Sequence, residues 1–144
     1  MAEYYDVFEN RVRFAETDMQ GIVFYGNYVT FQDETFNAFL RKFDYGYDTF
    51  EARGWDVHVV HVDLDYHASA EFDDVLVNAM RAETIGTKSL TFAYRARRKA
   101  DDALLASGHV TYVAVDTETG EPCRVPDDFR EALLKFQETP PEMK

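Results

Sequence analysis

The most restrictive feature of the sequence is a period of two that runs through most of residues 56–115. Apolar and polar residues alternate over several stretches, and clusters of Asp, Gly and Thr separate the stretches as turns. Long strands joined by short turns form an antiparallel sheet, because parallel strands need longer crossovers. The alternating sets are Val60, Val62, Leu64 and Tyr66, then Leu90, Phe92, Tyr94 and Ala96, then Val110, Tyr112 and Ala114, while the mostly apolar run Val75 to Ile85 fits a more buried strand.

One stretch with the periodicity of an α-helix precedes these strands. It extends from about Asn27, a favourable N-cap residue, to Lys42, and basic residues near its end complement the helix dipole. The spacing of i, i+3, i+4 and i+7 predicts one apolar face. That face carries Phe36, Phe39, Leu40 and Phe43.

Two shorter elements complete the predicted domain. Residues 7–14 alternate as a strand, and residues 127–137 after Pro126 are typical of a closing helix. We therefore predict an α+β fold, in which an antiparallel sheet of about five strands packs against one long helix. A single helix covers only one face of such a sheet, so the other face or an edge is expected to meet a partner subunit.

Length and composition limit the class of protein. The 144 residues suit one domain, which we place at 1–138, with 139–144 expected as a frayed tail. The net charge of −12 disfavours nucleic acid and anionic membrane surfaces as partners. Cys123 is the only cysteine, which excludes an intrachain disulfide and a thiolate-rich metal site. The N-terminal residues do not show the pattern of a signal peptide and no apolar run approaches roughly 18 residues, so we expect a cytoplasmic protein without membrane insertion.

The chemistry-bearing stretch lies between the first strand and the long helix. Asp18-Met-Gln-Gly21 fits a type I β-turn, and a short apolar passage leads from it to the helix start. Backbone N–H groups at a helix N-terminus lack partners within the helix. A carboxylate beside such donors suits acyl transfer, because the donors stabilise an oxyanion while the carboxylate attacks or activates water.

The stretch Thr17-Asp18-Met-Gln-Gly21-Ile-Val-Phe-Tyr25-Gly-Asn-Tyr28 resembles the signature of the 4-hydroxybenzoyl-CoA thioesterase family. Weaker similarity continues through residues 62–74 and 88–92 to the Pro126 segment. The resemblance implies a hotdog fold in which the sheet wraps around the central helix, and a homodimer or homotetramer with active sites between subunits. It also implies that Asp18 is the catalytic carboxylate and that the N–H of Tyr25 polarises the thioester oxygen.

Further residues are candidates for substrate contacts. Gly26 and Asn27 follow Tyr25 directly, and His61 lies on a strand expected to border the partner's active site. The basic cluster around Arg97 and Arg98, with Lys88 and Ser89, either binds the phosphates of coenzyme A or balances an acidic surface. Glu16 is interpreted mainly as a solvated acid. His58 and His61 point to opposite strand faces, so no metal site is predicted. Gly86-Thr-Lys88-Ser89 is interpreted as a hairpin turn.

The predicted function is hydrolysis of a small aliphatic or aromatic acyl-CoA, with coenzyme A entering only as part of the substrate and no other cofactor. The sequence does not identify the acyl group, distinguish coenzyme A from an acyl carrier protein, or decide between Asp18 as nucleophile and as general base. A non-catalytic acyl-CoA-binding module is one alternative. A hotdog enoyl-CoA hydratase is another, although its usual histidine is missing, because no histidine lies within residues 1–57.

Overall fold

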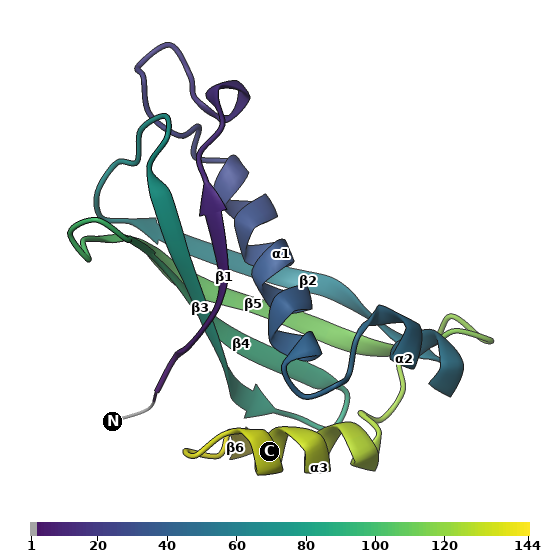
Figure 1. The fold of residues 1–144 in the computed structure, drawn as a ribbon. Helices are drawn as coiled ribbons and strands as arrows, with labels where there is room; N and C mark the ends of the chain where they lie inside the picture. Colours follow the sequence, from purple (N-terminus) through teal and green to yellow (C-terminus); the bar gives the residue numbers. More distant parts are fainter. Residues whose placement is uncertain (1–2) are drawn as a thin grey trace.

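The computed structural model describes residues 3–144 as one sheet with three α-helices (Figure 1). In chain order its elements are β1 (Tyr5–Arg11), the 3-10 helix η1 (Phe14–Glu16), α1 (Asn27–Arg41), α2 (Tyr47–Arg53), β2 (Trp55–Tyr66), β3 (Val75–Ile85), β4 (Ser89–Arg98), β5 (Leu104–Asp116), α3 (Asp127–Phe136) and β6 (Glu142–Met143).

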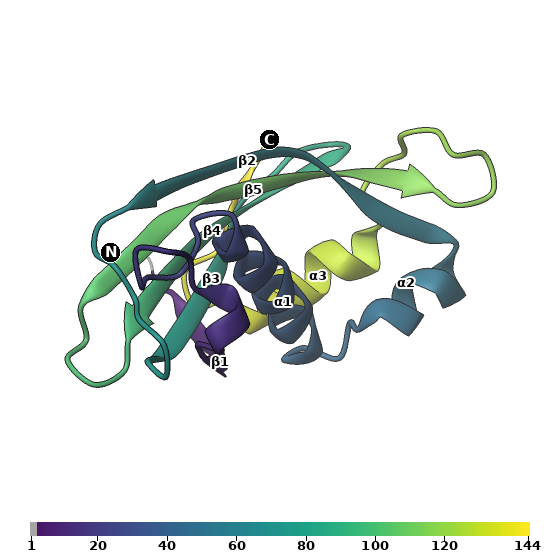
Figure 2. The same cartoon turned by 90° about the horizontal axis from the view of Figure 1, so that it is seen from above.

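The sheet has the strand order β1-β3-β4-β5-β2, and every pair along this path is antiparallel. It curves around α1, which lies on its concave side (Figure 2). The predicted α+β hotdog architecture, with one long helix against about five strands, is therefore confirmed. The short strand β6 adds a parallel pairing with β3.

The core lies between the apolar face of α1 and the concave face of the sheet. Phe36 stacks on Tyr112 of β5, with ring centroids 4.2 Å apart, and meets Phe92 of β4 edge to face at 5.1 Å. Phe39, one turn later, is completely buried. The predicted helix face and the predicted inward sets of β4 and β5 are confirmed, because the alternation reports which side of each strand is buried.

The first predicted strand ends earlier than the sequence indicated. β1 stops at Arg11, and residues 14–16 form η1. Glu16 closes this turn, because its carboxylate accepts hydrogen bonds from the backbone N–H of Arg13 at 2.8 Å and from the Arg13 guanidinium at 3.0 Å. The side chain of Phe14 is consequently 77% exposed and does not continue an inward strand set.

A β-bulge in β2 changes which of its residues share a face. Val59 pairs with Tyr112, but His61 pairs with Thr111, so Val60 is the extra residue. The prediction that Val60 and Val62 face one way and Val59 and His61 the other is therefore wrong. Val59 and Val62 both face α1, whereas His61 faces the convex side, because one inserted residue reverses the alternation.

Two elements were absent from the predicted arrangement. The seven-residue helix α2 lies between Gly46 and Gly54, and is too short to show a clear helical period. The expected frayed tail instead forms β6, and the N–H of Lys144 donates to the carbonyl of Ile85 at 2.8 Å. Gln137 fixes the approach of this segment through hydrogen bonds between its side-chain amide and both backbone groups of Ala82.

Candidate active site

Asp18 lies in a closed turn at one end of the molecule. The N–H of Gly21 donates to the carbonyl of Asp18 at 2.9 Å, and Gly21 has a φ of +79°, a conformation that favours glycine. The N–H of Gln20 donates to Oδ1 of Asp18 at 2.9 Å. Within residues 3–144, Oδ2 of Asp18 has no hydrogen-bond partner, so the half-buried carboxylate retains an acceptor for chemistry.

Asn27 ties η1 to the start of α1. Its side-chain amide donates to the carbonyl of Glu16 at 2.8 Å, and the N–H of Phe24 donates to the same oxygen at 2.9 Å. Asn27 is the first residue of α1, not its N-cap as predicted, because its side chain bonds backward to η1. Glu16 is only 8% exposed and pairs with Arg13, which corrects its interpretation as a solvated acid.

The backbone at Tyr25 and Gly26 presents two free donors just before α1. In the described part of the chain, neither N–H has a hydrogen-bond acceptor. The hydroxyl of Tyr66 donates to the carbonyl of Tyr25 at 3.1 Å, which fixes the peptide between Tyr25 and Gly26. These donors lie at the positive end of the α1 dipole and suit an oxyanion. Sequence reasoning missed Tyr66, which lies 41 residues further along the chain.

Aromatic side chains surround the helix start. Tyr25, which is 64% exposed, packs against Phe24 and Tyr66 with ring centroids 4.6 and 6.3 Å apart. Tyr28 and Phe31 are buried core residues. Burial, together with the nearby Tyr66 hydroxyl, raises the pKa of Tyr28 to about 12, so this group stays a neutral hydroxyl. The site thus combines an aromatic wall with polar groups at the backbone donors, at Asp18 and at the tyrosine hydroxyls.

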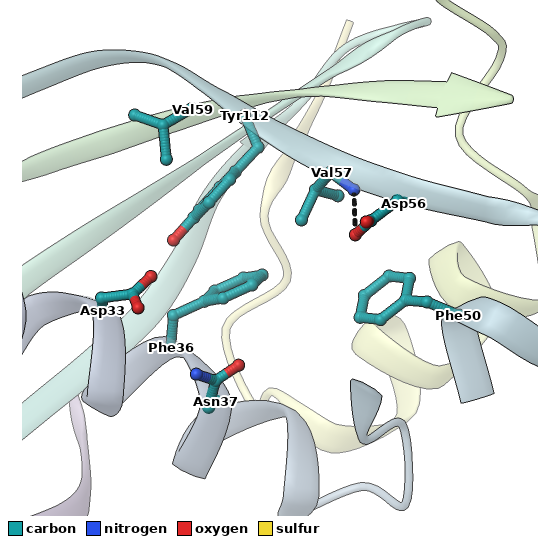
Figure 3. Close-up of a pocket in the computed structure, with 8 residues that line it drawn as sticks. All are labelled: Asp33, Phe36, Asn37, Phe50, Asp56, Val57, Val59 and Tyr112. Carbon is teal, nitrogen blue, oxygen red and sulfur yellow. Dashed lines mark hydrogen bonds between the residues drawn. The ribbon is translucent and has the colours of Figure 1, made fainter. Parts of the chain in front are cut away.

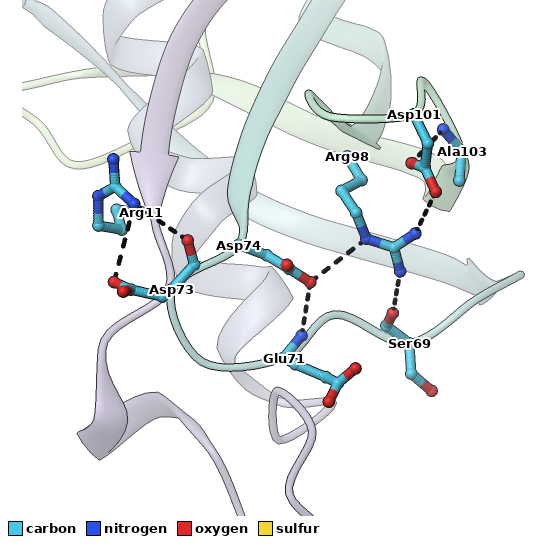
Figure 4. A network of polar contacts seen from close by, with 8 residues as sticks. All are labelled: Arg11, Ser69, Glu71, Asp73, Asp74, Arg98, Asp101 and Ala103. Atoms are coloured by element: carbon cyan, nitrogen blue, oxygen red, sulfur yellow. Dashed lines mark hydrogen bonds and ion pairs between the residues drawn. The ribbon is translucent and has the colours of Figure 1, made fainter.

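Arg98 lies in a network of polar contacts with the loop before β3 and the turn after β4 (Figure 4). Its guanidinium donates to the carbonyl of Ser69 at 2.6 Å and pairs with Asp74 at 3.3 Å and Asp101 at 2.8 Å. These contacts hold the loop before β3, and the carbonyl of Ala70 in that loop accepts a hydrogen bond from the N–H of Val23 at 2.8 Å. Arg98 therefore braces the segment between Asp18 and Tyr25.

Other predicted contacts face the convex side of the sheet. Oδ2 of Asp63 lies 3.1 Å from Nε2 of His61, and Oδ1 lies 3.2 Å from Nδ1 of His109. The guanidinium of Arg97 pairs with Asp6 at 2.8 Å and with Asp102 at 2.6 Å. The structure does not bring His61 or Arg97 together with Asp18 in the same subunit.

Lys88 and Ser89 lie at the other end of β3 from the Asp18 loop (Figure 1). The N–H of Gly86 donates to the carbonyl of Ser89 at 2.8 Å, which confirms the predicted hairpin turn. β3 has 11 residues, and at about 3.3 Å per residue it separates the two ends by roughly 35 Å. These two residues can approach an Asp18 carboxylate only if it belongs to another subunit.

A groove separates α1 from β2 on the concave side (Figure 3). One cavity of about 260 Å³ is lined by residues that include Phe36, Asp33 and Tyr112. A neighbouring cavity of about 220 Å³ shares Asp33 and Tyr112 and extends to Val29 and Gln32, toward the helix start. The groove therefore begins one turn of α1 beyond the free donors.

The described range, residues 3–144, contains no group of three or more His, Cys, Asp or Glu side chains placed to hold a metal ion. In the same range, no helix is long and apolar enough to cross a membrane.

Residues 12–133 match the family model of the thioesterase-like superfamily. The chain is 28% identical over 116 residues to the acyl-CoA thioester hydrolase YbgC of Escherichia coli. The aligned region covers 81% of this chain and 86% of that protein. A hypothetical protein of Thermus thermophilus with a solved structure is 30% identical, with a TM-score of 0.82 and coverage of 89% of this chain and 96% of the other. A solved gentisyl-coenzyme A thioesterase is 25% identical, with a TM-score of 0.78 and coverage of 88% and 98%.

Proposed function

The chain belongs to the thioesterase-like superfamily and is a thioesterase, and we propose that it hydrolyses a small aliphatic or aromatic acyl-CoA with Asp18 as its catalytic carboxylate. One observation carries this proposal. The 3-10 helix η1, which ends two residues before Asp18, is hydrogen-bonded through the carbonyl of Glu16 to Phe24 and Asn27, which flank the free N–H groups of Tyr25 and Gly26. The relatives named for acyl-CoA or gentisyl-CoA hydrolysis support the substrate class.

The thioester carbonyl would accept a hydrogen bond from the N–H of Tyr25, with Gly26 alongside. Preorganised backbone donors stabilise the negative charge that develops on this oxygen in the transition state. Asp18 would either attack the carbonyl carbon to form an anhydride that water then opens, or remove a proton from the attacking water. In both routes the C–S bond breaks, coenzyme A leaves as the thiol, and the acyl group leaves as the acid.

The active unit would be a homodimer or homotetramer. β2 is a terminal strand, and among the described strands it pairs only with β5. Its side chains Val59 and Val60 are 52% and 61% exposed. An unpaired strand edge with apolar side chains favours pairing with a second copy. A second subunit would also be the source of any contact from His61, Lys88 or Ser89 to coenzyme A.

Four other residues were predicted to contact the substrate, namely Gly26, Asn27, Arg97 and Arg98. Gly26 and Asn27 would border the thioester, since they adjoin the Tyr25 donor. The guanidinium of Arg97 already has two carboxylate partners, so a coenzyme A phosphate would have to compete with them. The same competition applies to Arg98. A cytoplasmic location is part of the proposal.

The proposal is tested by release of free thiol from a panel of acyl-CoA thioesters, from acetyl to palmitoyl and including benzoyl, hydroxybenzoyl and phenylacetyl. Asp18→Asn should lower kcat by about 10²–10⁴-fold, the range typical of a general base. Glu71→Gln, which neutralises an exposed carboxylate of the adjacent loop, is the matched control and should retain activity. Full hydrolysis by Asp18→Asn would exclude the assigned role, and saturable binding without hydrolysis by the wild type would favour a binding module.

A further inference from the structure

Gln32 is a buried amide without a partner. It is 1% exposed, and its Nε2 has no hydrogen-bond partner among the residues that the structure describes. Gln32 lines the cavity of about 220 Å³ between α1 and β2. The rest of that wall is largely apolar and includes Val29, Val59, Val62 and Val110. A single amide in a valine-lined cavity is a polar feature that the fold itself does not use.

An unpartnered amide in an apolar site has a free-energy cost that a bound polar group can remove. The amide of glutamine carries a donor and an acceptor, and rotation about its last torsion exchanges the two. A hydroxyl also both donates and accepts, so it can pair with either orientation of the amide. Gln32 therefore matches a hydroxyl better than a group that only donates or only accepts.

The cavity lies further along the axis of α1 than the proposed reaction centre at Tyr25. At 1.5 Å per residue, the Cα of Gln32 lies about 10 Å along the axis from that of Tyr25. Side chains on a helix lean toward its N-terminus, which brings the amide roughly one turn closer. An acyl group whose carbonyl oxygen contacts the Tyr25 N–H would run past Val29 to reach Gln32.

The charge at the far part of the groove limits which acyl groups can bind there. Asp33 lines both cavities, and Asp56 lines the more distant one (Figure 3). The carboxylate of Asp33 points toward the hydroxyl of Tyr112. Two carboxylates in a groove repel an acyl group that ends in a carboxylate. The groove thus favours a neutral acyl group.

We propose that this cavity receives the acyl group and that Gln32 is a specificity-determining residue for acyl groups that carry a hydroxyl on a neutral, otherwise apolar chain. The inference rests on the proposed function, because it assigns the acyl subsite of the same reaction. Residues of α1, β2 and β5 form the subsite, and it begins one turn of α1 beyond the helix start where the thioester would bind.

The test compares hexanoyl-CoA with 6-hydroxyhexanoyl-CoA and with an acyl-CoA that ends in a carboxylate, adipoyl-CoA. A hydrogen bond between neutral groups corresponds to a roughly 2- to 12-fold preference, so wild-type kcat/KM should favour the hydroxylated substrate by that factor over hexanoyl-CoA. Adipoyl-CoA should be the poorest of the three. Gln32→Met keeps the length of the side chain and removes the amide, so it should bring the ratio of kcat/KM for 6-hydroxyhexanoyl-CoA over hexanoyl-CoA to about one.

Asn37→Met provides the matched control, since Asn37 lines the more distant cavity and not the proposed acyl subsite, and this variant should keep the preference. The inference is overturned if Gln32→Met keeps the wild-type ratio, or if the wild type has no preference. It is also overturned if Gln32→Met changes the mass of the assembly in solution, because the amide would then pair with a second copy. Failure of the proposed function gives a different result, namely no thiol release from any of the three thioesters.

Discussion

The candidate functional groups on the two faces of the sheet differ in how they are paired. On the convex face, His109 contacts both Asp63 and Glu83, and His61 contacts Asp63, at 3.1–3.2 Å. On the concave side, the N–H of Tyr25 and the amide of Gln32 have no partner in the described chain. A group that already has a partner must lose it before it binds a ligand, so the unpaired concave groups are the better indicators of function.

Residue type alone does not reveal this difference. His61 and Arg97 are typical of catalytic and phosphate-binding sites, yet both lie on the convex face with carboxylate partners. Gln32 and the backbone of Tyr25 are ordinary constituents of a helix and its start. The candidate groups on the two faces differ in whether a backbone or amide donor is left unpaired, and the following predictions test that difference.

The largest effect is expected at the tether between η1 and α1. Asn27→Ala removes the hydrogen bond to the carbonyl of Glu16, which lies two residues before Asp18. Displacement of reacting groups by about 1 Å can cost 10²-fold, so we expect kcat to fall by roughly 10- to 100-fold while KM changes less. Steady-state kinetics on the preferred acyl-CoA measure both constants.

Thr30→Ala on the same helix is the control for helix stability, because Thr30 is exposed and lies on the side of α1 that faces β1. This variant should retain kcat. An equal loss of kcat in both variants would indicate general destabilisation of α1 and contradict a specific positioning role for Asn27.

A smaller effect is expected on the convex face. His109→Gln removes the link between Asp63 and Glu83, whose side chains are both 46% exposed. Pairs this exposed contribute about 0–1 kcal/mol, so urea denaturation should detect at most that change in the free energy of unfolding. We expect kcat/KM to stay within about twofold of wild type. A loss of kcat as large as that of Asn27→Ala would remove the functional distinction between the two faces.

The smallest effect concerns acid pH. Burial acts to raise the pKa of Asp63, but hydrogen bonds from His109 and His61 outweigh it, and the pKa lies below its ordinary value of 3.8. A lowered folded-state pKa contributes stability above pH 3.8 that is lost as the pH falls through the folded-state pKa. The stability difference between wild type and Asp63→Asn should therefore shrink in urea denaturation as the pH falls below 3.8. A difference that grows on acidification would contradict the pairing.

The main helix and most of the sheet could be predicted from the sequence, because the periodic apolar patterns extend over many residues. Sixteen predicted helical positions and the alternating sets of β4 and β5 report directly which side of each element is buried. The turn at Asp18 and its position just before α1 were also predictable, since Gly21 supplies the conformation that closes the turn.

The rest depends on long-range contacts. The bulge at Val60 follows from the pairing of β2 with β5, and it moves Val59 to the concave groove. β6 pairs with β3, and Gln137 reaches Ala82 of β3, 55 residues earlier in the chain. Similarly, no local pattern reveals that Tyr66 would hold the Tyr25 peptide. Partners distant in sequence decide these features.

The central claim is that the N–H of Tyr25 receives the thioester oxygen on the concave side. The most direct measurement is the backbone amide spectrum of the ¹⁵N-labelled protein, recorded with a non-hydrolysable ketone analogue of the preferred acyl-CoA. We predict that Tyr25 and Gly26 show the largest downfield amide proton shifts, because their N–H groups gain an acceptor, while Asp63 and His109 stay unchanged. Shifts concentrated at Asp63 and His109, with Tyr25 unaffected, would contradict the account.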